Sequence, residues 1–473
     1  MRNALSFLRI DDVPPLSRAS YRLERRHFSL WPLFVAGVEG NVAAIVAKLT
    51  FDVSNVLATI VWATPFVALV LNLVWGPLLR GRARVPGMLL LGSCGTVCVA
   101  SIGFTPPDWH PWNGYIFAAQ LASAHFFLSG LITLRTSVWK HNYPEVMRAQ
   151  ITSRFHMMRQ AIVMAGAAAI GVLFDRHPDA YRYVYPGIAI FAAMALLPLR
   201  KLPVRGEARE LRLIRETAAA QPATRLGLLN VFAILGRDPR FARYQFAQFL
   251  LGAANFFTEP VLIAVITNDL KLGYAWSIGL MTILPMAISL PTINWWATKF
   301  DALGVVRFRI INTAVWFFNY TTVLVFLILT RPYVGTPVWL SVLVIIAARV
   351  LFGFCRGGGQ MAWTLGHLSF APPGQVETYM SVHVALTGVR GLIMPLVGAG
   401  AFWLAGPWAG VGGVALISVA HWQFRRLAAL QALDASEASQ GRISPRSSAE
   451  IARPRRAIVG AVTAAETQQP ETP

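Results

Sequence analysis

Continuous apolar stretches, each about as long as a membrane is thick, recur along this chain. A helix crosses a bilayer with about 20 mainly apolar residues, whereas a transmembrane β-strand alternates apolar and polar positions over about ten. The stretches are continuous, so they predict an all-α polytopic membrane protein with twelve transmembrane helices. We place these helices near residues 31–49, 55–78, 86–104, 113–134, 152–174, 183–199, 244–267, 274–296, 306–330, 337–358, 378–404 and 407–423.

The composition agrees with lipid as the main surroundings. Hydrophobic residues make up 55% of the 473 residues and charged residues only 14%, against about 45–50% and about 25% in soluble domains. This balance argues against disorder, a coiled coil or nucleic-acid binding as the main property, despite a formal charge of +20. Cys94, Cys98 and Cys355 all lie within apolar stretches, so we expect no disulfide framework, no metal and no cofactor.

Basic residues predict the orientation of the helices. Of the 42 lysines and arginines, 32 fall on the side of the predicted helices that carries both chain ends, and 4 fall on the other side. Because cytoplasmic loops are enriched in basic residues, both termini are expected in the cytoplasm, near anionic lipid head groups. Nucleic acid is not needed to explain the charge. Arginine outnumbers lysine 37 to 5, which suggests a GC-rich bacterial source and hence the inner (plasma) membrane.

A polar stretch divides the predicted helices into two groups of six. The expected organisation is a basic cytoplasmic segment (1–30), a six-helix bundle (31–199), a cytoplasmic linker with a short surface helix (200–243), a second six-helix bundle (244–424) and a disordered cytoplasmic tail (425–473).

The two halves also repeat one another. Glu39 recurs as Glu259, 220 residues later, and His125 is matched by Arg349, 224 residues later. Offsets that stay nearly constant along the chain predict two related six-helix bundles, and parallel repeats of this kind are a known transporter architecture.

Two loops carry a family resemblance. Asp301, Gly304 and Arg307 form an Asp-x-x-Gly-x-x-Arg pattern, and over residues 28–425 the chain resembles the major facilitator superfamily, which has this pattern in a cytoplasmic loop. In the corresponding first-half loop, Arg80 stands where the family has an acid that acts in the cytoplasmic gate. The gate-loop candidates are Gly76, Arg80, Arg84, Asp301, Gly304 and Arg307.

Ionisable residues deep in the predicted helices should carry the function, because a charge at the centre of a membrane helix costs about 2.5–3.5 kcal/mol. The resemblance implies that predicted helices 1, 4, 7 and 10 surround a central cavity, and these four contribute Glu39, His125, Glu259 and Arg349. By helical spacing, Asn41 lies on a different face from Glu39. Other ionisable residues lie nearer the cytoplasmic ends, where long side chains can reach the head groups: Arg154, His156, Arg159, Arg356 and His383.

Predicted helix 7 has a polar face. Gln245, Gln248, Gly252, Asn255 and Glu259 are spaced 3, 4, 3 and 4 apart, which places them on one side of a helix. Such a face either hydrogen-bonds to neighbouring helices or lines an aqueous cavity, and we favour the cavity because the acid ends the stripe. The candidates for binding substrate or protons are Glu39, His125, Gln248, Asn255, Glu259, Arg349, His383 and Arg390.

Together these features predict a secondary active transporter that moves a small solute by alternating access, coupled to protons. Glu39 or Glu259 is the expected proton carrier; alternatively, one of them forms a static ion pair with Arg349 or Arg390. Two deep acids against Arg349, Arg390 and titratable His125 favour an anionic or zwitterionic solute. The competing class is a protein on the same scaffold that does not transport solute: a sensor, an assembly subunit or a lipid scramblase. An enzyme is not expected, because the sequence has no nucleophile, metal or phosphate-binding constellation.

Overall fold

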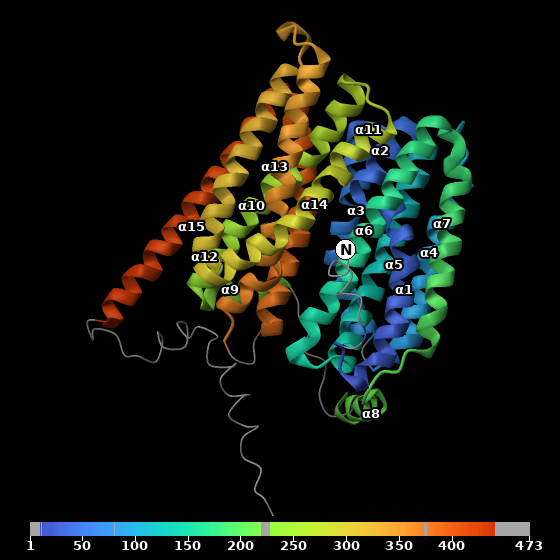
Figure 1. Ribbon diagram of the computed structural model, residues 1–473, viewed down its shortest axis with the longest axis vertical. Helices are drawn as coiled ribbons and strands as arrows, with labels where there is room; N and C mark the ends of the chain where they lie inside the picture. The colour runs from blue at the N-terminus through green and yellow to red at the C-terminus, as the bar shows by residue number, and fades with distance from the viewer. Residues whose placement is uncertain (1–9, 11, 80, 219–227, 373–375, 440–473) are drawn as a thin grey trace, which may run out of the picture.

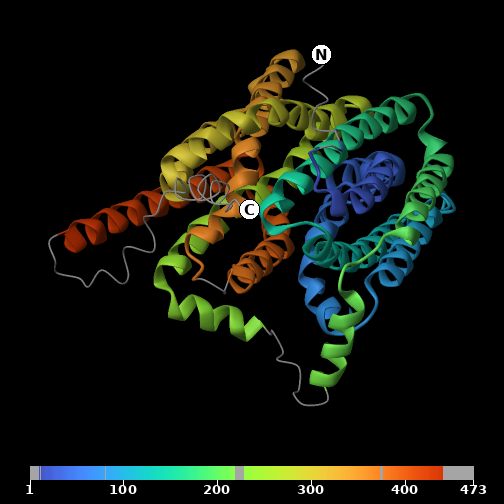
Figure 2. The same cartoon turned by 60° about the horizontal axis from the view of Figure 1, so that its bottom comes forward.

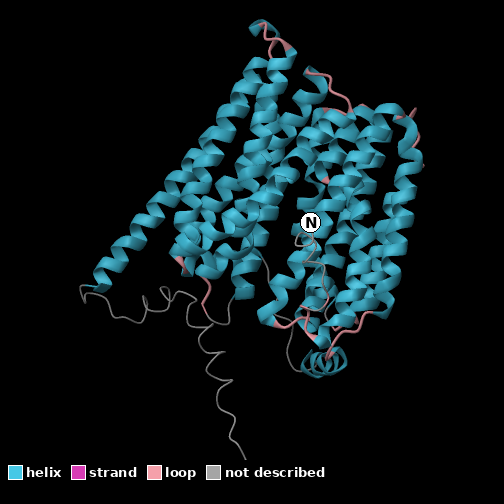
Figure 3. Ribbon diagram, in the orientation of Figure 1, coloured by secondary structure: helices cyan, strands magenta, loops and turns pink. Residues whose placement is uncertain are grey.

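The fold is helical throughout the described part of the chain (Figure 3). The computed structural model describes residues 10, 12–79, 81–218, 228–372 and 376–439. The first group of helices comprises α1 (Arg18–Val38), α2 (Gly40–Phe51), α3 (Asn55–Leu79), α4 (Arg84–Ile102), α5 (Trp112–Asn142), α6 (Glu145–Arg176) and α7 (Tyr181–Leu196). Two helices lie in the connecting stretch, α8 (Glu207–Ala218) and α9 (Leu228–Arg237).

The helices after this connection contain two segments of π-helix, in which the usual hydrogen-bond ladder is displaced by one residue. The α-helices are α10 (Pro239–Ala264), α11 (Tyr274–Ile278), α12 (Leu284–Leu329), α13 (Val338–Leu365), α14 (Val376–Ala405) and α15 (Ala409–Ser439). The π-helical segments are η5 (Val265–Asp269) and η6 (Gly279–Ile283). Short 3₁₀ turns are η2 (Pro15–Ser17), η3 (Pro178–Ala180), η4 (Leu197–Lys201), η7 (Pro332–Val334), η8 (Gly366–Ser369) and η9 (Gly406–Trp408).

The helices form two sets that lie side by side (Figures 1 and 2). In what we call the first set, α1 to α7 pack mainly on one another; in the second set, α10 packs on α14 and α15, and α12 packs on α13 and α15. The sets meet where α3 contacts α14 and where α6 contacts α11. We call the end of the molecule that carries α8 and the end of α15 the linker end, and the opposite end, near α11, the far end.

Eight helical stretches among the described residues are long and apolar enough to cross a membrane, or nine if α1 and α2 count as one broken span. Two of the eight, Tyr274–Leu329 and Tyr379–Leu433, contain 56 and 55 residues. A straight helix of this length would extend for about 80 Å, far beyond the about 30 Å of a bilayer core. Each stretch is interrupted by a glycine with positive φ, Gly304 at 71° and Gly406 at 56°, a conformation in which other residues are strained.

The first predicted helix is broken where the sequence predicts a continuous span. Glu39 has extended backbone (φ −60°, ψ 135°), and α1 and α2 meet there at 46°. The Glu39 carboxylate accepts hydrogen bonds from the backbone N–H groups of Asn41 (3.0 Å) and Val42 (3.2 Å). An acid is favoured at this position because it satisfies free N–H groups and faces the positive end of the helix dipole.

Several helices continue past their apolar stretches. Helix α6 begins at Glu145, and α10 begins at Pro239, directly after Asp238, whose carboxylate accepts from the N–H of Phe241 at 2.9 Å. Helix α15 continues to Ser439, beyond residue 425, where the sequence analysis expected the tail to begin. The reason is local: alanine, leucine and glutamine are good helix formers whether or not lipid surrounds them. The rest of the expected tail lies outside the described residues.

Candidate functional site

The break at Glu39 lies where the two sets touch. Thr282, in η6, donates a hydrogen bond to the Glu39 carboxylate at 3.2 Å. Beside it, the amide nitrogen of Asn41 donates to the backbone carbonyl of Met281 at 3.0 Å. The Asn41 oxygen in turn accepts from the indole N–H of Trp62 at 2.7 Å. A broken helix of the first set is therefore hydrogen-bonded to a π-helical segment of the second.

The η6 segment also contacts a deep ion pair, the one that the structure shows among the described residues of the second set. Arg349 donates to both oxygens of Glu259, at 2.6 and 3.3 Å. Its remaining N–H groups reach the carbonyls of Leu280 (3.2 Å) and Met281 (3.0 Å). The Met281 carbonyl thus accepts from Asn41 of one set and Arg349 of the other, so Glu259 is linked to the interface through its arginine.

Two further arginines approach Glu39 from opposite sets. Arg356, on α13, interacts electrostatically with Glu39. Arg159, on α6, interacts electrostatically with Glu39 and with Arg356. Arg159 is exposed and Arg356 and Glu39 are partly exposed, whereas Glu259 and Arg349 are buried, so this cluster is more accessible than the deep pair. Glu39 forms no ion pair with the described residues, because neither arginine comes within 4 Å of it.

From the apolar stretches alone, Arg159 and Arg356 are expected nearer the cytoplasmic helix ends. Since α6 begins at Glu145 and α13 continues to Leu365, beyond the predicted limit at 358, both arginines lie further inside their helices than the apolar stretches suggested.

The other candidates lie within one set each. His125 is buried in the first set, where its ring contacts the Leu121 carbonyl (2.9 Å), the Thr64 hydroxyl (3.1 Å) and the backbone of Val38 at the helix break. His125 therefore contacts the helix break from inside the first set. Asn255 accepts a hydrogen bond from Tyr320 at 2.7 Å inside the second set.

Gln248, His383 and Arg390 form a third group. Arg390 donates to the backbone carbonyl of Gln248 at 2.7 Å, and the His383 ring lies 3.0 Å from the Gln245 oxygen. The polar face of α10 thus contacts α12, α13 and α14 of its own set. Its hydrogen-bonding pattern favours contact between helices over the expected aqueous cavity.

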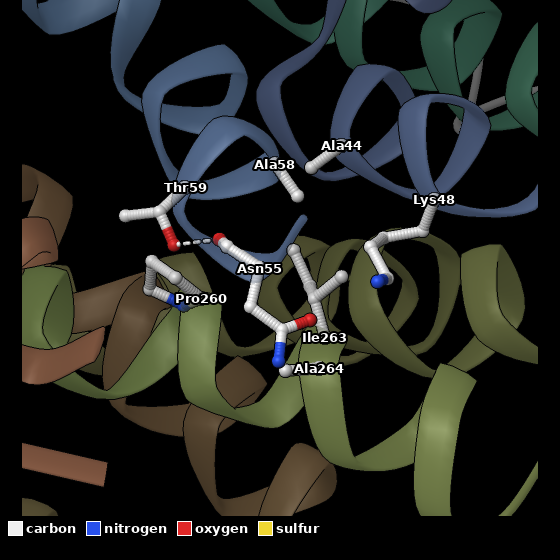
Figure 4. A pocket seen from close by; sticks show the side chains of 8 residues that line it. All are labelled: Ala44, Lys48, Asn55, Ala58, Thr59, Pro260, Ile263 and Ala264. Atoms are coloured by element: carbon white, nitrogen blue, oxygen red, sulfur yellow. Dashed lines mark hydrogen bonds between the residues drawn. The ribbon is translucent and has the colours of Figure 1, made fainter. Parts of the chain in front are cut away.

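The far end of the interface is closed by hydrogen bonds between the sets. The Asp175 carboxylate accepts from the N–H groups of Tyr274 (2.6 Å) and Ala275 (3.0 Å) at the start of α11. Asn268 donates to Asn55 at 2.9 Å. Between α2, α3 and α10 only a cavity of about 10 Å³ remains, lined by residues that include Lys48, Asn55 and Pro260 (Figure 4), which is room for about one water molecule.

Among the described residues, the hydrogen bonds between the sets lie at or beyond the middle of the helices. The one nearest the linker end joins Gln160, midway along α6, to the hydroxyl of Ser289 at 2.9 Å. From there the contacts continue through Glu39 and Asn41 to Asn55 at the far end. The geometry is that of two bodies hinged together over their far halves.

Comparison with known proteins identifies this arrangement. A model of the Major Facilitator Superfamily matches residues 30–395. The chain belongs to this superfamily. It is therefore an integral, multi-pass membrane protein of a transporter family and not an enzyme, and the resemblance noted in the loops is confirmed. No curated protein matches the chain.

Solved structures of the superfamily share the fold at low sequence identity. The nucleoside transporter NupG aligns with a TM-score of 0.63 and 12% identity, over 86% of this chain and 99% of that one. The xylose transporter XylE of E. coli, in an inward open conformation, aligns with a TM-score of 0.59 and 14% identity, over 86% and 96%. A POT family transporter in complex with a thioalcohol conjugated peptide gives 0.62 and 13%, over 89% and 98%.

The loop before α4, which carries the first-half gate-loop candidates, contacts the linker. Arg84 forms ion pairs with Glu207 (3.5 Å) and Glu210 (2.5 Å) of α8, and its backbone N–H donates to Glu207 at 2.7 Å. His141 lies 2.8 Å from Glu210. Burial alone would raise the pKa of the Glu210 carboxyl, but the hydrogen bond and charge of Arg84, with a contribution from His141, lower it below 4.5. Glu207 and Glu210 thus bring acids to a loop that has Arg80 at the usual acidic position.

The remaining gate-loop candidates are placed without such contacts. Gly304 provides the positive φ that turns the chain within α12, while Asp301 and Arg307 are exposed and form no ion pair with each other. Gly76 lies in α3, and Arg80 is outside the described residues.

The structure therefore divides the eight binding candidates among four places: the interface with Glu39, the interior of the first set with His125, the Glu259–Arg349 pair, and the interior of the second set. Sequence reasoning missed Asn41, Thr282, Arg159 and Arg356 as partners of Glu39. Asn41 was set aside by helical spacing, which no longer applies once the helix breaks at Glu39. A polar pair flanking a glycine, Glu39-Gly40-Asn41, was the available signal.

Proposed function

We propose that this protein is a secondary active transporter that moves a small anionic or zwitterionic solute by alternating access, coupled to protons. The two helix sets would be its two six-helix bundles. Twelve membrane crossings result if each of the two long stretches counts as two spans, α1 and α2 count as one, and α3 is added to the others. Basic residues concentrate at the linker end, so that end and both termini would face the cytoplasm of a bacterial cell. The conformation, closed at the far end, would then be inward-facing.

The cluster around Glu39 supports this function. It lies between the two sets, it is accessible, and it combines one carboxylate with arginines contributed by each set. An anionic group of the solute that contacts Arg159 and Arg356 together would join the two sets, while Glu39 could bind a proton or a positively charged group of the solute. Binding that differs between two arrangements of the sets is what alternating access requires.

Among the acids, Glu39 is the better candidate for the proton carrier. Glu259 is held by two hydrogen bonds to Arg349 in a buried pair, which favours the static ion pair for that residue. Glu39 accepts only from neutral groups, namely two backbone N–H groups and Thr282. A carboxyl without a bonded cation can take up and release a proton more easily than one in an ion pair.

The test is transport by the purified full chain in proteoliposomes. A panel of radiolabelled monocarboxylates, amino acids, sugars and nucleosides would be screened by counterflow, in which a preloaded unlabelled solute drives uptake of the label. We expect saturable counterflow with a carboxylate or an amino acid, and uptake driven by an inward proton gradient that a protonophore abolishes.

Glu39→Gln should lose uptake driven by the proton gradient but retain counterflow, because the solute site remains while the titratable group is gone. Proton-driven uptake at the wild-type rate in Glu39→Gln would remove Glu39 from the mechanism. Counterflow absent for every solute, together with fast movement of a fluorescent lipid between leaflets, would instead favour the scramblase alternative.

A further inference from the structure

Buried polar atoms without a hydrogen-bond partner gather in the interior of the second set, on α10, α12, η8 and α14. Native proteins leave few such atoms, and each of them needs an explanation, such as a bound ion. More than half of those found among the described residues belong to this one cluster. They are Nε2 of Gln245, Oε1 of Gln248, Nε and Nη2 of Arg309, Nδ1 of His367, Nε2 of His383 and Nε of Arg390.

The contacts show that these residues form one group. The His383 ring lies 3.0 Å from the Gln245 oxygen, and its centroid lies 6.4 Å from that of His367. Arg390 donates to the Gln248 carbonyl on the next turn of α10 at 2.7 Å. Arg309, on the part of α12 after Gly304, interacts electrostatically with both Arg390 and His383.

The group carries positive charge without a described counter-charge. Guanidinium groups remain protonated in proteins, and the side chains of Arg309 and Arg390 have 0% and 5% of their surface exposed. Neither forms an ion pair with a described carboxylate. Arg309 donates to Asn312 at 3.2 Å and interacts with the hydroxyl of Tyr244, and Arg390 donates to Gln248 and to the hydroxyl of Thr387. Arg349, on the neighbouring α13, shows the contrast, since it is bound by Glu259.

Burying two like charges without a counter-ion is costly, because each loses its hydration and repels the other. Glycine at position 252 leaves room for the Arg390 guanidinium, because a Cβ there would lie 2.0 Å from the Arg390 Cζ atom. A side chain at position 252 would therefore displace the guanidinium.

We propose that a small monovalent anion of the chloride class binds here, held by the free N–H groups of Arg309, Arg390 and Gln245. The anion must be small, because the surrounding side chains leave at most 5% of their surface exposed. The site lies inside the second set, apart from the Glu39 cluster between the sets. It goes beyond the proposed function, since it would stabilise this set of helices whether or not the protein transports a solute.

The test is thermal unfolding of the detergent-purified full chain in sodium chloride and in sodium gluconate at equal ionic strength. An ion that binds only the folded state raises the unfolding temperature until its site is saturated. We expect a saturable rise with chloride or bromide and no rise with gluconate. Arg390→Gln should weaken the chloride effect at least tenfold. Its unfolding temperature in gluconate should equal or exceed that of the wild type, because one uncompensated buried charge has been removed. Arg425→Gln, an exposed arginine on α15, is the matched control and should leave the chloride effect unchanged.

A rise of equal size in chloride and gluconate, or a chloride effect unchanged in Arg390→Gln, would overturn the proposal. Chloride-35 NMR on the wild-type protein provides a second measurement that needs no variant. Broadening of the chloride signal that is reversed when bromide displaces chloride supports the site. A chloride signal that the protein does not broaden counts against the site. Stabilisation by acetate but not by chloride would contradict the assignment to a small anion.

Discussion

At the residue scale, the ion pair of Glu259 and Arg349 corresponds to one of the two alternatives that the sequence leaves open, the static ion pair. Both residues are candidates for binding substrate or protons, and the structure joins them through two hydrogen bonds. Arg349 also donates to the η6 carbonyls of Leu280 and Met281. Breaking a buried pair by removing one partner leaves an uncompensated charge, which costs about 3–5 kcal/mol. The pair should therefore matter for stability first.

Arg349→Leu should accordingly lower the free energy of unfolding by about 3–5 kcal/mol, measured by reversible denaturation in micelles. Arg349→Lys keeps the charge but not the paired geometry, so its loss should be smaller. The exposed Arg307→Gln should fall within about 0.5 kcal/mol of the wild type. Arg349→Leu unfolding like the wild type would mean that the pair contributes nothing to stability.

At the scale of helices, the sequence predicts where the membrane helices lie better than where they are interrupted. Apolar stretches locate the membrane helices because backbone polar groups must be satisfied within lipid. They do not predict the break at Glu39 or the π-helix at η6, because both depend on partners that are remote in sequence: Thr282 for Glu39, and Asn41 and Arg349 for the Met281 carbonyl. The interface cluster could not be assembled from spacing alone for the same reason. The acids that bind Arg84 likewise come from α8, more than a hundred residues away in the sequence.

The contact of α8 with Arg84 should depend on pH and on its acids. Because the pKa of Glu210 is lowered by Arg84, its contribution is fully present above the unfolded value of 4.5 and is lost as pH falls below that value through the folded pKa. Glu207→Gln combined with Glu210→Gln should mimic acid pH at pH 7. We expect trypsin to cleave the arginine-rich 205–215 segment faster in this double variant. Asp179→Asn, which changes an exposed acid at the far end, is the control, and trypsin should cleave its 205–215 segment at the wild-type rate. Cleavage of the double variant at the wild-type rate would mean that other contacts hold α8 in place.

At the scale of the molecule, the hydrogen bonds between the sets in the described part of the chain lie at the middle and the far end. Alternating access requires these bonds to break during each cycle. At the far end, the side chains of Asn55 and Asn268 make a contact of this kind at 2.9 Å. A covalent link there should hold the far end shut.

The most direct measurement is counterflow in proteoliposomes by a variant that carries Asn55→Cys and Asn268→Cys, with Cys94, Cys98 and Cys355 replaced by alanine. Under reducing conditions the variant should exchange solute like the cysteine-free parent. Oxidation should stop the exchange in proportion to the fraction cross-linked, and reduction should restore it. Exchange at the full rate through completely cross-linked protein would contradict alternating access between these two helix sets.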